Sequence, residues 1–127
     1  MSEPKRILCI EDQSEMVDLF RMILEQNKFQ VSGAMGGAEG IKQARAQKPD
    51  VILLDLMMPG MDGWEVFKQL KTDPTTQNIP IVVVTARSEG IDKLLGLHIA
   101  KVEGYITKPF GPKELVESVS RVLGKSP

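Results

Sequence analysis

The chain has 127 residues, of which 42% are hydrophobic and 26% are charged, and its net charge is −1. This composition is typical of a soluble globular protein, and the small net charge gives no support to binding of nucleic acid or membranes. The first residues lack the apolar core of a signal peptide, and no apolar run approaches the length needed to cross a bilayer. We therefore expect a cytoplasmic protein that forms one domain over residues 1–127, with a core from about 5 to 124 and a frayed tail at 125–127.

Short apolar runs alternate with amphipathic stretches along the whole chain. The predicted strands cover 6–10, 29–33, 51–55, 81–85 and 104–108. The predicted helices cover 14–27, 38–47, 63–71, 89–100 and 112–123. The strongest strands are continuous and rich in β-branched residues, which is typical of strands buried on both faces of a parallel sheet. The pattern is a strand–helix unit repeated five times, so right-handed crossovers place helices on both faces of the sheet.

Two features inside these elements carry further expectations. Cys9 lies in the apolar stretch "ILCI", so we expect a buried and inert thiol. Gly40 lies inside the second helix and costs about 1 kcal/mol relative to alanine, which predicts a weak helix there.

Polar residues gather where the predicted strands end. Glu11 and Asp12 follow the first strand, Asp55 ends the third, Thr85 ends the fourth and Lys108 ends the fifth. Because the carboxyl ends of parallel strands form one edge of the sheet, these side chains are expected to converge there. Three neighbouring carboxylates repel one another unless a hard divalent cation such as magnesium is bound between them. A carboxylate in such a site can attack a phosphoryl group and form an aspartyl-phosphate, with Lys108 and Thr85 stabilising the charge that develops.

Four segments resemble the signature segments of bacterial response-regulator receiver domains. They are "CIEDQ" (9–13), "LLDLMMPGMDG" (53–63), "VVVTA" (82–86) and "YITKPF" (105–110). The resemblance keeps the family's order and spacing over roughly residues 5 to 124 and includes a likeness to the chemotaxis response regulators. It implies a single doubly wound (βα)5 flavodoxin-like α/β fold, with a five-stranded parallel sheet in the order 2-1-3-4-5.

The resemblance also implies a role for each residue at the strand ends. Asp55 would accept a phosphoryl group from a sensor histidine kinase or a histidine phosphotransfer protein. Asp12 would hold Mg2+ directly and Glu11 through water or at longer reach, with Asp55 and the backbone carbonyl of Met57 as further ligands; Mn2+ can substitute. The chain would not be an enzyme in the ordinary sense, because it would catalyse only its own phosphorylation and dephosphorylation.

Signalling would start from the phosphoryl group. Thr85 and Lys108 would bind the phosphoryl oxygens, and Tyr105 would reorient when Thr85 moves. The signal would reach an output partner on the face formed by residues 89–123, without direct contact with nucleic acid or a membrane. A cis peptide bond is expected between Lys108 and Pro109, where it would aim the lysine inward.

The chain departs from the family pattern at three positions. Lys101 stands where glycine is usual, which suggests a reshaped turn there. Glu11 stands where aspartate is more common, and its longer arm is expected to retune metal affinity. Gly40 stands where alanine is common, which suggests a more loosely packed second helix. The side chains of Met57, Met58 and Met61 are expected to pack within the loop that follows Asp55.

Three other functions share parts of this pattern. A haloacid-dehalogenase-like phosphatase also uses a strand-end aspartate and magnesium, but it has a second acid two residues later, where this chain has Met57. A flavodoxin-like carrier needs a hydroxyl-rich phosphate loop after the first strand, where this chain has the acidic "EDQSE". A non-phosphorylated pseudo-receiver that serves only as a scaffold would not require Asp12, Asp55, Thr85 and Lys108 together.

Overall fold

A computed structural model of the chain describes residues 3–58, 63–86 and 102–124. The strands are β1 (Arg6–Ile10), β2 (Gln30–Ala34), β3 (Val51–Asp55), β4 (Ile81–Ala86) and β5 (Gly104–Lys108). The helices are α1 (Ser14–Gln26), α2 (Gly37–Gln47), α3 (Gly63–Thr72) and α5 (Pro112–Val122). Every described element begins and ends within one residue of the predicted range. The helix predicted at 89–100 lies outside the described residues, as do Met61 and Lys101.

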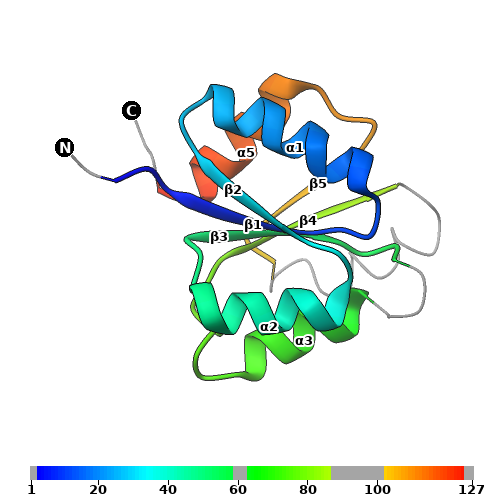
Figure 1. Ribbon diagram of the computed structural model, residues 1–127, viewed down its shortest axis with the longest axis vertical. Helices are drawn as coiled ribbons and strands as arrows, with labels where there is room; N and C mark the ends of the chain where they lie inside the picture. Colours follow the sequence, from blue (N-terminus) through cyan, green and yellow to red (C-terminus); the bar gives the residue numbers. More distant parts are fainter. Residues whose placement is uncertain (1–2, 59–62, 87–101, 125–127) are drawn as a thin grey trace.

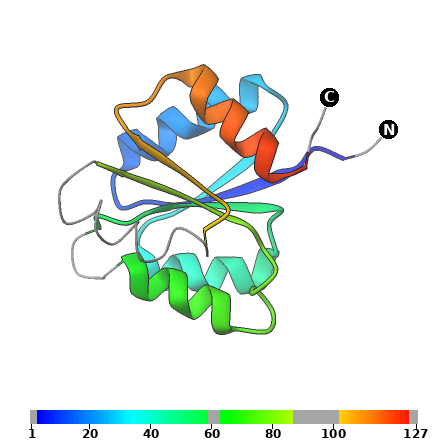
Figure 2. The ribbon, with the colours of Figure 1, turned by 180° about the vertical axis from the view of Figure 1, so that it is seen from behind.

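The five strands form one parallel sheet in the order β2-β1-β3-β4-β5, as predicted. Helices α1 and α5 cover one face of the sheet, and α2 and α3 cover the other (Figure 1, Figure 2). All strands point the same way, so the carboxyl ends of β1, β3, β4 and β5 lie along one edge. The predicted doubly wound α/β fold is confirmed for the described residues.

Alternation along the strands divides the core into two clusters, one on each face. Strand residues such as Leu54 and Val83 pack with α2 and α3. Their neighbours Leu53 and Val84 pack with α1 and α5. Successive strand residues point to opposite faces, so this division also indicates the face toward which residues at the carboxyl ends of the strands point. The central strand β3 is buried along its whole length, which explains its continuous apolar sequence.

Gly40 has a packing role that the sequence did not reveal. It is buried where α2 crosses β1, and a Cβ atom at this position would lie 2.6–2.7 Å from three side-chain atoms of Ile10. The glycine therefore lets the helix approach the sheet more closely than alanine would. The expectation of a loosely packed second helix was wrong, because the missing side chain brings the two backbones together.

Two smaller expectations are met, at Cys9 and at the Lys108–Pro109 bond. Cys9 is buried, and the loss of contact with water raises the pKa of its thiol above the ordinary value. The Lys108–Pro109 peptide bond is cis. Gly124 follows the last residues of α5 with a φ of 70°, the left-handed conformation that ends many helices.

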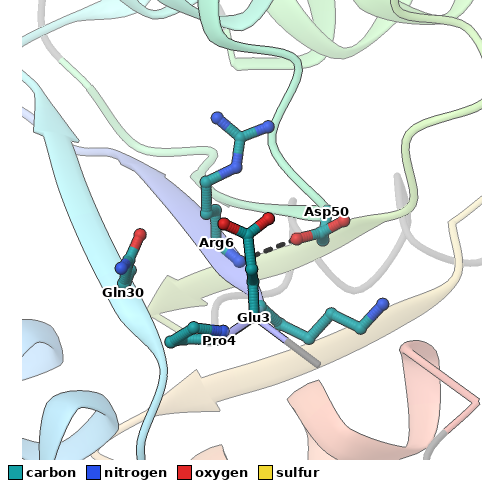
Figure 3. A pocket seen from close by; sticks show the side chains of 6 residues that line it. Glu3, Pro4, Arg6, Gln30 and Asp50 are labelled. Carbon is teal, nitrogen blue, oxygen red and sulfur yellow. Dashed lines mark hydrogen bonds between the residues drawn. The ribbon is translucent and has the colours of Figure 1, made fainter. Parts of the chain in front are cut away.

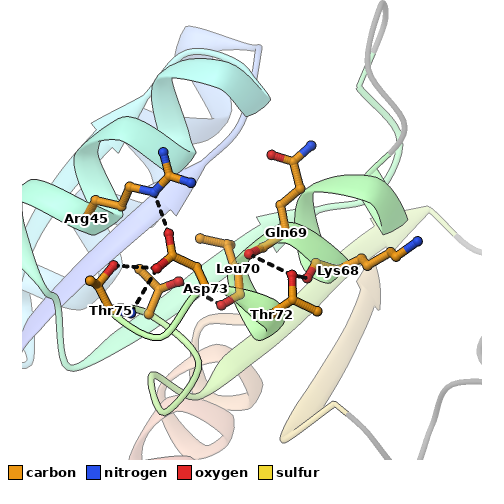
Figure 4. Close-up of polar contacts among 8 residues, drawn as sticks. Arg45, Lys68, Gln69, Leu70, Thr72, Asp73 and Thr75 are labelled. Atoms are coloured by element: carbon orange, nitrogen blue, oxygen red, sulfur yellow. Dashed lines mark hydrogen bonds and ion pairs between the residues drawn. The ribbon is translucent and has the colours of Figure 1, made fainter.

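A polar network joins α2 to the segment after α3, close to the amino-terminal ends of the strands (Figure 4). Asp73 accepts hydrogen bonds from the backbone N–H and the hydroxyl of Thr75, both at 2.8 Å, and pairs with Arg45. These bonds favour the ionised carboxylate and lower the pKa of Asp73 to about 2. The network ties the two helices of this face together at the end remote from the acidic residues.

The amino-terminal edge of the sheet carries a hollow of about 370 Å³ (Figure 3). Its wall includes Arg6 at the start of β1, Gln30 at the start of β2 and Asp50 just before β3. The backbone N–H of Arg6 donates to Asp50 at 2.8 Å, and its guanidinium donates to the carbonyl of Lys48 at 2.7 Å. These bonds join the start of β1 to the segment before β3, so we interpret the hollow as a structural feature of this edge of the sheet. Among the described residues, no helix is long and apolar enough to cross a bilayer.

Candidate functional site

Three carboxylates meet at the carboxyl edge of the sheet. Glu11 and Asp12 directly follow β1, and Asp55 is the last residue of β3, the strand beside it. One carboxylate oxygen from each lies within 4.8 Å of the others. Glu11 and Asp55 are buried, whereas Asp12 is half-buried. The sequence predicted this convergence because the carboxyl ends of parallel strands share one edge, and the structure shows a compact cluster.

Lys108 brings a positive charge to the same cluster. Its Nζ lies 3.3 Å from Oδ2 of Asp55 and 3.4 Å from Oε2 of Glu11. Both distances are longer than the 2.7–2.9 Å usual for a charge-assisted hydrogen bond, so the ammonium lies between the two acids and is bound tightly to neither. Alternation along the strands places all three side chains toward the α1 and α5 face.

The pKa of Glu11 is shifted by this arrangement. Burial away from water, and then the neighbouring Asp55 carboxylate, raise the pKa of Glu11 to about 8, although Lys108 acts in the opposite direction. A carboxyl group with this pKa holds a proton near neutral pH when no cation is bound. The backbone N–H of Gln13 donates to Oε1 of Glu11 at 3.4 Å, which turns the carboxylate toward the start of α1.

The chain after Asp55 turns back onto the same carboxylate. The backbone N–H of Met57 donates to Oδ1 of Asp55 at 2.9 Å, so one carboxylate oxygen faces the loop and the other faces Lys108. Gly63 begins α3 against the backbone of Leu56, where a Cβ atom would come within 2.4 Å of the Leu56 Cα. This close approach holds α3 directly behind the loop. The side chain of Met58 is packed as expected, but that of Met57 is 53% exposed, so its expected packing was wrong.

Thr85 and Tyr105 lie on the other face of the sheet from the acid cluster. Asp55 is paired with Val84, so Thr85 lies one residue beyond it at the end of β4. Its side chain is buried, and its hydroxyl donates to the carbonyl of Ala86 at 3.3 Å. Alternation places Thr85 and Tyr105 on the same face, with the tyrosine 43% exposed on β5.

The donors at this edge suit a hard divalent cation. The candidate ligands are carboxylate oxygens, two of them buried, and the raised pKa of Glu11 shows that positive charge is favoured between them. Magnesium binds such oxygen sets and keeps several waters, which the half-buried position of Asp12 leaves room for. Asp55 also has the environment of a nucleophile, since it is held from both sides at the end of a rigid strand.

The comparison with protein families decides between the candidate functions. The model of the response regulator receiver domain matches residues 7–120, which includes every residue of the site. This chain belongs to the response regulator receiver domain family. It is thus a receiver domain of the two-component response regulators, and the match does not favour a haloacid-dehalogenase-like phosphatase.

Individual relatives of this receiver domain support the same assignment. It is 40% identical over 122 residues to the alkaline phosphatase synthesis transcriptional regulatory protein PhoP of Bacillus subtilis. The aligned region covers 96% of this chain and 50% of PhoP. It is 38% identical over 119 residues to the protein PilH of Pseudomonas aeruginosa, covering 93% of this chain and 97% of PilH.

A solved structure of a similar protein contains a magnesium ion. The receiver domain of the sensor histidine kinase PA1611 from Pseudomonas aeruginosa was crystallised with a magnesium ion coordinated in its active-site cleft. It superimposes with a TM-score of 0.85 at 26% identity, covering 95% of this chain and 98% of that one. This receiver domain spans about half the length of PhoP and of several other curated relatives.

The sequence missed the direct pairing of Lys108 with Glu11. Glu11 was expected to hold Mg2+ through water or at longer reach, which stays a prediction, and the structure adds that it is fully buried and shares the ammonium with Asp55. No local pattern reports this contact, because the two residues are 97 positions apart and meet only through the strand order. The sequence also gave no role to Phe20 and Phe110, whose contact is described below.

Proposed function

We propose that Asp55 is the phosphoacceptor of this receiver domain and that the donor is a phosphohistidine on a sensor histidine kinase or a histidine phosphotransfer protein. The observation that supports this most strongly is the placement of Asp55 between the Lys108 ammonium and the Met57 N–H at the end of a fully buried strand. Both contacts orient the carboxylate, one on each of its two oxygens.

The proposed step is a phosphoryl transfer between two residues. A carboxylate oxygen of Asp55 attacks the donor phosphorus as the phosphorus–nitrogen bond breaks, and the imidazole leaves with that electron pair. The products are an aspartyl-phosphate and a free histidine. Later attack of water on the phosphorus releases inorganic phosphate and restores the carboxylate. Lys108 and the Thr85 hydroxyl bind the phosphoryl oxygens on which negative charge is concentrated.

Glu11, Asp12, Asp55 and the backbone carbonyl of Met57 are proposed to hold Mg2+, for which Mn2+ can substitute. Their support is the cluster of three carboxylates and the raised pKa of the buried Glu11. When bound, the metal ion would neutralise the acid cluster and the phosphoryl oxygens. We infer no direct contact with nucleic acid by this domain, because its net charge of −1 offers no excess of positive charge for phosphate groups.

Thr85 and Tyr105 are proposed to carry the signal from the site. They share the face of the sheet opposite the acid cluster, so a shift of the Thr85 hydroxyl toward the phosphoryl group would change the space beside the tyrosine. The output partner is proposed to bind the surface formed by residues 89–123, of which the described part includes β5 and α5. We further propose that the domain occupies the whole of 1–127 and acts in the cytoplasm.

Phosphorylation with a small donor tests the function. Incubation with acetyl phosphate and magnesium should add one phosphoryl group, detected by intact mass, and peptide mapping should assign it to Asp55. Asp55→Asn should abolish the addition, and a chelator should do the same. Asp50→Asn is the matched control, because Asp50 lies just before the amino end of the same strand. A label on another residue, or a label that persists in Asp55→Asn, would contradict the proposal.

A further inference from the structure

Two phenylalanines join α1 to the loop that follows Lys108. The rings of Phe20 and Phe110 are stacked, with centroids 5.5 Å apart and planes only 8° from parallel. Phe20 is buried in the middle of α1, and Phe110 is half-buried two residues after Lys108. Aromatic pairs of this geometry contribute energy beyond their buried area and restrict the relative position of the two rings.

The position of Lys108 depends on what holds the chain on each side of it. On its amino-terminal side, Lys108 is paired with Ala86 as the last residue of β5. On its carboxyl-terminal side, Pro109 and Phe110 leave the sheet before α5 begins at Pro112. The stacking of Phe110 on Phe20 fixes this side of the loop to α1. Lys108 is therefore held between a strand and an aromatic contact.

The same helix also positions one of the metal-site acids. α1 begins at Ser14, two residues after Asp12, and runs along the face toward which Lys108, Glu11 and Asp55 point. Through the phenylalanine stack, α1 thus fixes the position of the lysine relative to the acids. Precision matters here, because Nζ of Lys108 lies at nearly equal distances from two carboxylates. A small rotation of the loop would bring it closer to one acid and away from the phosphoryl position.

We infer that Phe20 and Phe110 are positioning residues for the phosphoryl transfer and that they act by aiming Lys108 at the carboxylate pair. The inference rests on the proposed function of Asp55. It assigns the two rings no contact with the donor. Their effect on the reaction is therefore expected to pass entirely through the lysine.

Phe110→Leu is the main test, because Phe110 is only half-buried and the change removes the ring while keeping an apolar side chain. The rate constant for phosphorylation of Asp55 by acetyl phosphate with magnesium is expected to fall about tenfold or more, since misplacement of a catalytic group by an ångström can cost a hundredfold. Phe110→Tyr keeps the ring and should react at the wild-type rate. Phe67→Leu is the matched control, since it removes a buried ring on the other face of the sheet.

A double-mutant cycle separates aiming from a general loss of structure. In a Lys108→Ala background, Phe110→Leu should cause no further decrease in rate, because the group it positions is already gone. Phe20→Leu should behave like Phe110→Leu in both backgrounds, and circular dichroism should show each variant folded.

The inference is overturned if Phe110→Leu reacts at the wild-type rate, or if it slows the reaction equally with and without Lys108. It is also overturned if Phe67→Leu slows the reaction as much as Phe110→Leu does. These outcomes differ from a failure of the proposed function, which would appear as an unmodified Asp55 in the wild-type protein and would overturn both.

Discussion

Replacing Glu11 by glutamine tests how strongly the acid cluster opposes folding in the absence of a divalent cation. Burial and the Asp55 carboxylate raise the pKa of Glu11 from 4.5 to about 8 in the folded protein. In the unfolded chain, water restores the lower value. Between the two values the folded protein keeps a proton that the unfolded chain has lost, so a rise in pH favours unfolding.

The size of the effect follows from the size of the shift. Each pKa unit corresponds to about 1.4 kcal/mol, and the Glu11 side chain is fully buried, so little of the penalty is screened by solvent. The wild-type protein is expected to lose roughly 3–5 kcal/mol of unfolding free energy between about pH 5 and pH 8 because of this one residue. Glu11→Gln has no proton to lose and should remove most of this dependence.

Urea unfolding in the presence of a chelator, followed by circular dichroism at both pH values, measures the difference. Glu11→Gln should be the more stable protein at pH 8 and should have no such advantage at pH 5. Glu114→Gln, at an exposed position in the first turn of α5, is the matched control and should follow the wild type. Excess magnesium should abolish the advantage of glutamine at pH 8. Parallel pH profiles for the wild type and Glu11→Gln would refute the reasoning.

Three further predictions concern packing, a polar network and signal transmission. Gly40→Ala should destabilise the protein by about 1–2 kcal/mol, because contact with Ile10 outweighs the gain in helix propensity, and a gain in urea resistance would contradict this. Asp73→Asn should lower the melting temperature at pH 7, and the difference should shrink as pH falls from the unfolded pKa of 3.8 toward 2, where the wild-type carboxylate is also protonated; a constant difference would exclude a role for its charge. Thr85→Ala should still be phosphorylated by acetyl phosphate but should lose most of the amide NMR shift at Tyr105 that beryllofluoride causes in the wild type, and a full shift would show that the coupling bypasses the threonine.

The sequence predicted the framework well because hydrophobic periodicity is a local signal. The stretch "VILLD" predicts a strand buried on both faces, and β3 covers these same residues and is buried along its whole length. The order of the strands came from the family resemblance, since no pattern within a single strand encodes its neighbours. Once that order was assumed, the meeting of Asp55 with Glu11 and Lys108 followed from topology.

What the sequence could not predict depends on distances between remote segments. The helix propensity of Gly40 is a local property, whereas its contact with Ile10 exists only after α2 has packed on β1. In the same way, adjacent residues Glu11 and Asp12 look equivalent in the sequence, yet the first is buried and the second half-buried. Their difference in burial is set by the strands on either side and by Lys108.

The complete burial of β3 should make the hydrogen exchange of its backbone amides slow. Its amides lie in the middle of a five-stranded sheet with helices over both faces, so they should exchange with solvent only when the whole protein unfolds. Asp55 is the last residue of that strand, and the chain beyond it turns immediately into a loop. Asp55, the proposed phosphoacceptor, therefore ends a strand whose amides should exchange among the slowest of the described residues.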